Sequence, residues 1–202
     1  SPTAIAATIA LRRASSPTET PDRTIQVQIA DGKGGSVVET AVVQRTIDVD
    51  GLYKDKVTFT DYPWTQALDK LKALGSDFAK VVFPDDNGLT KEWSLVFPKT
   101  VTDLLSGSGT NVEIVTNEAR IYLPAASLRG LTEDLNFRIA PVQQEDERKA
   151  AERRALTDPL TLEAARGGSV EALGRPIVIE SNLSGAEAQL ILPLEETRKL
   201  DK

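Results

Sequence analysis

The side chains that usually move protons or attack bonds are sparse in this chain of 202 residues. It contains no histidine and no cysteine, which excludes Ser-His-Asp triads, Cys–His dyads, imidazole metal sites and disulfides. Ser108 lies between two glycines but lacks the G-x-S-x-G context of a nucleophile elbow, so we interpret it as a loop residue. Glu180 ends the apolar run 177–179 and is expected to stay solvated there. The sequence therefore predicts no catalytic residue and no enzyme.

Two acidic turns could hold calcium, the one cofactor that the sequence leaves open. The candidate ligands are Asp48 and Asp50 in the first turn, and Asp85, Asp86 and Asn87 in the second. Calcium takes six to eight oxygen ligands, so either turn would need help from a second loop. Both turns also fit plain hairpins, because Asp-Gly and Asn-Gly favour type I′ geometry, and the plain turn is the interpretation that we favour.

Three aromatic residues are candidates for stacking on a sugar ring: Tyr53, Tyr62 and Trp93. Core packing is the competing interpretation, above all for Trp93, which alternates with Leu95 and Phe97 as on one buried strand face.

Charge and composition narrow the classes of partner. The chain has 24 basic and 30 acidic residues, a net charge of −6, and 40% hydrophobic residues. These are ordinary globular proportions. An acidic surface repels phosphate backbones and anionic lipid, so nucleic acid and membrane are not expected partners.

Periodicity predicts the secondary structure. Alternating apolar residues indicate strands within 24–60, among them one continuous β-rich run at 37–47. The stripe Trp64, Leu68, Leu71 and Leu74 predicts a helix that ends at Gly75. Five apolar strands then end at a proline, which suits a strand end and the first turn of a helix. The segments 97–105 and 123–131 share this pattern, which suggests an internal repeat.

The remaining segments complete the predicted architecture. Helices are expected at 143–156 and 160–166, and strands at 176–180 and 188–192. The fold class is therefore α+β, mostly antiparallel, with about ten strands and three to five helices. Residues 1–23 are predicted to be a linker, 24–195 one module with two similar lobes (about 24–105 and 106–195), and 196–202 a tail.

Several segments resemble a module of large cell-surface proteins from Paenibacillus-type bacteria, which carry S-layer-homology domains for anchoring to the cell wall. The similar segments are 57–60, the helix up to Gly75, 111–124, 136–142 and 174–182. The resemblance implies an extracellular, wall-associated protein without enzymatic activity, whose partners include neighbouring domains of the same polypeptide.

The leading functional hypothesis is thus a structural or spacer module of a secreted surface protein. Two alternatives remain open. One is an adhesin-like module that binds cell-wall or environmental polysaccharide or host matrix, and the other is an accessory domain of an extracellular polysaccharide-degrading enzyme.

Overall fold

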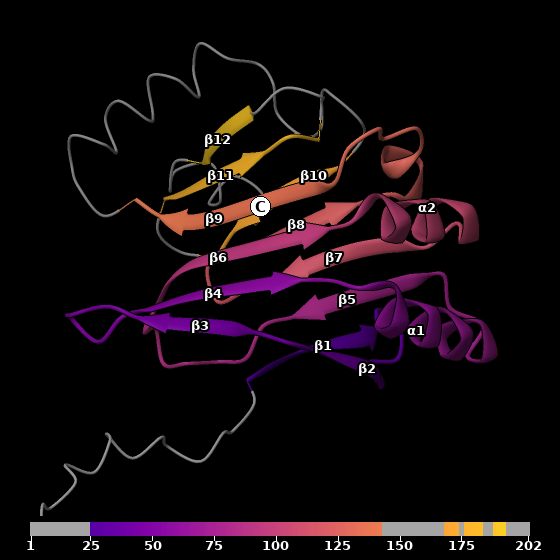
Figure 1. Ribbon diagram of the computed structural model, residues 1–202, viewed down its shortest axis with the longest axis horizontal. Helices are drawn as coiled ribbons and strands as arrows, with labels where there is room; N and C mark the ends of the chain where they lie inside the picture. The colour runs from indigo at the N-terminus through magenta and orange to yellow at the C-terminus, as the bar shows by residue number, and fades with distance from the viewer. Residues whose placement is uncertain (1–24, 143–167, 174–175, 184–187, 193–202) are drawn as a thin grey trace, which may run out of the picture.

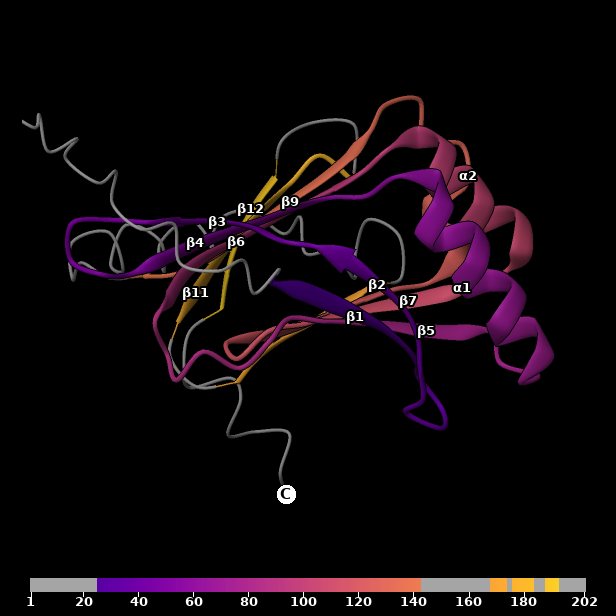
Figure 2. The same ribbon diagram turned by 60° about the horizontal axis from the view of Figure 1, so that its bottom comes forward.

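In the part of the chain that the structure describes, two six-stranded β-sheets face each other, and helices close one end of this sandwich (Figures 1 and 2). The structure is a computed structural model that describes residues 25–142, 168–173, 176–183 and 188–192. The predicted linker 1–23, the predicted tail 196–202 and the predicted helices at 143–156 and 160–166 lie outside the described residues.

Each sheet is mixed but mainly antiparallel. Sheet A has the order β10 (Ser169–Ala172), β8 (Ala119–Leu123), β7 (Asn111–Val115), β5 (Phe78–Val82), β1 (Gln26–Asp31) and β2 (Val37–Val42). Sheet B has the order β12 (Ala188–Leu192), β11 (Ile177–Ser181), β9 (Leu135–Pro141), β6 (Thr90–Phe97), β4 (Tyr53–Thr58) and β3 (Gln44–Ile47). Among the described strands, only the pairs β5–β7 and β4–β6 are parallel.

The helices carry the chain from one sheet to the other. Helix α1 (Asp61–Ala73) joins β4 to β5, and α2 (Lys99–Ser108) joins β6 to β7. Both helices end at a glycine with positive φ, Gly75 (φ 69°) and Gly109 (φ 66°), where a left-handed conformation is accessible without a Cβ penalty. The two β-α-β units therefore repeat in tandem, which explains why their strands pair in parallel.

Alternation along the strands builds one continuous core. In β1, Val27 and Ile29 are fully buried, whereas Gln26 and Gln28 are exposed. Where the strands meet the helices, the rings of Phe59, Trp64 and Phe97 pack together with centroids 4.8–6.2 Å apart. These rings tie α1 to sheet B.

The predicted β-rich α+β class is confirmed, but the predicted count of three to five helices is not matched. The described residues contain two α-helices and one 3₁₀ turn, η1 (Ala125–Leu128). The segment 123–131 makes only this short turn, and the tandem repeat lies instead in 53–82 and 90–115.

The β-rich run at 37–47 is two strands rather than one. Val43 separates β2 from β3, and the chain passes there from sheet A to sheet B.

Strands from 24–105 fill one half of each sheet and strands from 106–195 fill the other half, with a shared core. The division into two lobes stays a prediction.

Candidate functional site

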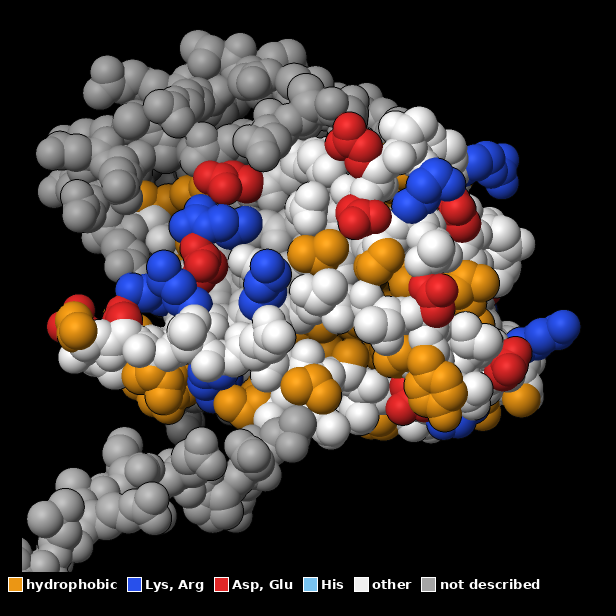
Figure 3. Space-filling model, viewed as in Figure 1, with side chains coloured by type: hydrophobic (Ala, Val, Ile, Leu, Met, Phe, Trp, Pro, Cys, Tyr) orange, Lys and Arg blue, Asp and Glu red, His pale blue; other side chains and the backbone are white. Residues whose placement is uncertain are grey.

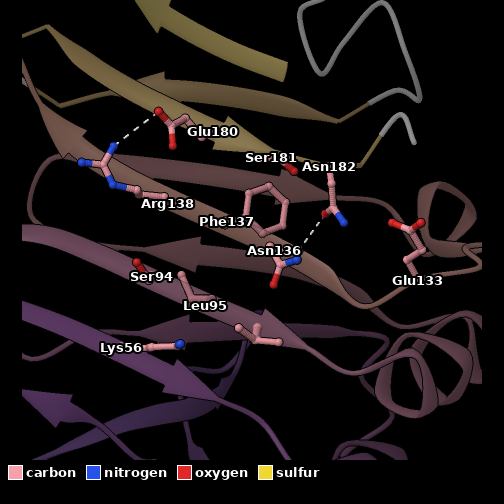
Figure 4. A pocket seen from close by; sticks show the side chains of 11 residues that line it. Lys56, Ser94, Leu95, Glu133, Asn136, Phe137, Arg138, Glu180, Ser181 and Asn182 are labelled. Atoms are coloured by element: carbon pink, nitrogen blue, oxygen red, sulfur yellow. Dashed lines mark hydrogen bonds and ion pairs between the residues drawn. The ribbon is translucent and has the colours of Figure 1, made fainter. Parts of the chain in front are cut away.

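A polar cleft lies on the outer face of sheet B, across β4, β6, β9 and β11 (Figure 4). Its volume is about 470 Å³. Strand register puts Lys56, Ser94, Arg138 and Glu180 in one row, each opposite the next. Because side chains alternate between the two faces of a strand, these residues point outward while their neighbours Leu95 and Phe137 point into the core. Ser94 is short and lies between longer side chains, which leaves the row hollow at its centre.

Two side chains of the cleft are held by neighbours. Arg138 donates from Nε to Glu92 and its Nη1 lies 3.5 Å from Glu180 Oε1. Asn182 accepts a hydrogen bond from the backbone N–H of Asn136 (2.9 Å) and donates to the carbonyl oxygen of Asp134 (2.8 Å). These contacts fix the β9–β11 side of the cleft.

The arrangement is suited to hydrogen bonding rather than to proton transfer. Glu180 has 45% of its side chain exposed and already pairs with Arg138, and Glu133 is exposed. A general acid at neutral pH requires a carboxyl group withdrawn from water. Neither carboxylate of the cleft meets that condition. No group of three or more carboxylates close enough to hold a metal ion exists among the described residues.

A second polar cluster lies on the inner face of sheet B. Arg45 on β3 makes two hydrogen bonds of 2.8 Å with Asp55 on β4, and the Tyr53 ring lies 4.1 Å from its guanidinium carbon. Asp55 is 1% exposed. The hydrogen bond with Asp55 raises the pKa of Arg45 further above its usual range, which outweighs burial. This ion pair stabilises the sheet edge rather than forming an open site.

The three predicted aromatic residues do not form a platform. Tyr53 is half-buried beside Arg45 at the start of β4, and Tyr62 is 70% exposed on α1, beyond the other end of that strand. Trp93 is 2% exposed and belongs to the core. The inclusion of Trp93 in a surface platform is therefore corrected: the inward face of β6 buries its ring.

The first acidic turn uses its oxygens internally. Asp48 Oδ1 accepts hydrogen bonds from the backbone N–H groups of Asp50 (2.9 Å) and Leu52 (3.0 Å), and Oδ2 pairs with Lys91. The Lys91 hydrogen bond, followed by those from the backbone, holds the pKa of Asp48 below its ordinary value. Asp50 contributes its backbone N–H to the turn.

The second acidic turn does meet a second loop. The Asn117 amide, in the turn between β7 and β8, donates to Oδ1 of Asp85 and Oδ1 of Asp86, both at 3.2 Å. Asn87 adopts a positive φ of 58°, which asparagine tolerates better than most residues. Asp86 is 8% exposed, and its Oδ2 has no hydrogen-bond partner among the residues that the structure describes. Calcium binding at this turn stays a prediction, and Asn117 is the residue that the sequence could not place beside it.

The comparisons with known proteins give no identification: no family model, curated protein or solved structure matches this chain. Within the part of the chain that the structure describes, no helix is long and apolar enough to cross a membrane.

Proposed function

We propose that the chain is a non-catalytic structural module of a secreted, cell-wall-associated bacterial surface protein. The observation that supports this role is that three aspartates have a lowered pKa because their side chains accept hydrogen bonds within the fold. The pKa of Asp31 is lowered first by the Ser76 hydroxyl, that of Asp48 by Lys91, and that of Asp77 by Lys33. A lowered pKa suits a fixed hydrogen-bond acceptor, whereas a general acid at neutral pH needs a raised one.

The resemblance to surface proteins of Paenibacillus-type bacteria supports the proposed extracellular location and the proposed neighbours, which are other domains of the same polypeptide. The architecture is compatible with this role, because backbone hydrogen bonds at the centre of each sheet link the halves of the sandwich: the parallel pair β5–β7 in sheet A and the antiparallel pair β6–β9 in sheet B. A module that transmits load between domains benefits from such continuity.

The test is a hydrolysis assay with the purified chain on panels of plant, fungal and bacterial glycans and of peptides. We expect no product above the blank, and no difference between wild type and the double variant Glu133→Gln/Glu180→Gln. Turnover by the wild type that this variant lacks would refute the non-catalytic role and assign the cleft carboxylates to chemistry.

The two alternatives differ in what they require. An accessory role within a polysaccharide-degrading enzyme predicts a catalytic domain on the same polypeptide, which the complete open reading frame would reveal. An adhesin-like role that rests on aromatic stacking loses support, because Trp93 is in the core and the two tyrosines lie apart.

A further inference from the structure

The cleft on sheet B contains polar side chains with unused hydrogen-bonding capacity. Lys56, Ser94, Glu133 and the Asn136 amide line it, and none of these side chains makes a hydrogen bond or ion pair with the rest of the described chain. Figure 4 shows Asn136 between Lys56 and Glu133, below the fixed pair of Arg138 and Glu180. Donors and acceptors are thus available along the whole cleft floor.

The charges of the cleft cancel. Its lining contains two cations, Lys56 and Arg138, and two carboxylates, Glu133 and Glu180. On the face drawn in Figure 3, basic and acidic side chains are interspersed and neither sign forms an extended patch. Net charge of −6 on the whole chain adds no attraction for an anion. A balanced cleft of this kind favours a ligand without net charge.

Size and surface chemistry narrow the ligand further. Four neighbouring strands with a spacing of about 4.8 Å give a width of roughly 14 Å, which is enough for a short oligosaccharide. Among the described lining residues the one aromatic ring, Phe137, is 2% exposed and faces the core. The described lining therefore offers no exposed aromatic ring for stacking, so binding must come mainly from the ligand's hydroxyl groups, which both donate and accept hydrogen bonds.

From this geometry we propose that the cleft binds a neutral oligosaccharide, whose hydroxyl groups are held by Lys56, Ser94, Glu133 and Asn136. This role goes beyond a structural module and does not depend on it. Without a stacking ring, we expect a dissociation constant of about 0.1–1 mM.

The chain offers a matched control for this site. Lys54 and Lys56 are both exposed, lie two residues apart on β4 and project from the same face, but only Lys56 lines the cleft. Lys56→Gln and Lys54→Gln therefore remove the same charge from one strand face, inside and outside the site. Asn136→Ala removes an exposed amide whose side chain makes no hydrogen bond with the described residues, so it should leave the fold intact.

The experiment is a titration of isotope-labelled protein with cellohexaose, xylohexaose and chitohexaose, with hexagalacturonate as the anionic comparison, monitored by amide chemical shifts. We expect at least one neutral hexasaccharide to shift signals from Ser94 and Asn136, with an affinity that is insensitive to added NaCl. Asn136→Ala and Lys56→Gln should each weaken binding about tenfold, whereas Lys54→Gln should leave it within about twofold.

Three results would overturn the proposal. The first is no shift at the cleft with any neutral hexasaccharide at about 10 mM, well above the expected dissociation constant. The second is salt-sensitive binding of hexagalacturonate alone, which would make this an anion site. The third is equal affinity of Asn136→Ala and wild type, which would place binding elsewhere. Hydrolysis of a bound hexasaccharide would instead refute the proposed non-catalytic role while leaving the binding site in place.

Discussion

Replacing Asp55 with asparagine should lower the free energy of unfolding by about 3 kcal/mol. The Asp55 side chain is 1% exposed and that of Arg45 is 15% exposed, and the two share a bidentate contact at 2.8 Å. Breaking a buried ion pair from one side costs about 3–5 kcal/mol, because the other charge stays buried without its partner. The lower value applies because Arg45 keeps some contact with water and the Tyr53 ring lies 4.1 Å from it.

Urea unfolding with linear extrapolation measures this loss. Trp64 and Trp93 are buried in the core, so their fluorescence reports unfolding near the helices and in sheet B. The control is Asp103→Asn, which breaks the exposed i,i+4 pair with Lys99 (2.7 Å, side chains 52% and 48% exposed). That pair should contribute only about 0.3–0.5 kcal/mol, since water screens it.

The double variant Arg45→Met/Asp55→Leu provides the second half of the test. Exchanging both charges for apolar side chains should recover most of the lost stability, because no unpaired charge remains. A cost below about 1 kcal/mol for Asp55→Asn, or a cost equal to that of Asp103→Asn, would refute the view that this pair is buried and interdependent.

Three further changes test other parts of the structure. Hydrogen bonds, first from the Ser76 hydroxyl, lower the pKa of Asp31. The stabilising contribution of Asp31 is therefore present above its pKa in the unfolded chain and is lost as the pH falls through its pKa in the folded protein. Thermal unfolding midpoints should decline below about pH 4, and they should decline less steeply in Ser76→Ala. Gly32→Ala should destabilise by about 1–3 kcal/mol in urea unfolding, because the added Cβ would lie 2.2–2.7 Å from ring atoms of Phe78; an unchanged midpoint would mean that the ring moves freely. Any rise in the unfolding temperature on adding about 5 mM CaCl₂ should disappear in Asp86→Asn, and its persistence would exclude the turn at 85–88 as the binding site.

Local patterns predicted the elements that local forces determine. The alternation of Val27 and Ile29 predicted β1, and the apolar stripe with its terminal Gly75 predicted α1, which the structure confirms. The break at Val43 escaped prediction because burial continues to alternate across it, so the sequence pattern does not change where the chain moves between sheets.

The ion pair between Arg45 and Asp55 could have been predicted from the sequence. Arg45 lies an even number of residues from Ala41 and Val43, and Asp55 lies two residues from Val57. These three apolar residues are buried, so the alternation places both charged residues on the buried side of their strands. Opposite charges on the buried parity of two strands joined by a tight turn indicate an internal pair.

The cleft left no comparable signal. Lys56, Ser94, Arg138 and Glu180 come from four strands up to 124 positions apart in the sequence, and each alone resembles an ordinary solvated residue. Strand order and register bring them together, and these depend on tertiary packing that local periodicity does not encode.

At Val43 the strand registers of the two sheets depend on each other. Its N–H still donates to the carbonyl oxygen of Ile25 beside β1, while the very next residue pairs with Lys56 on β4. One extra residue inserted here would move every following side chain of β3 to the opposite face of the sheet. Arg45 would then point towards solvent, and Asp55 would stay buried without its partner. Insertions and deletions should therefore be tolerated far less at Val43 than in the turns on either side of it.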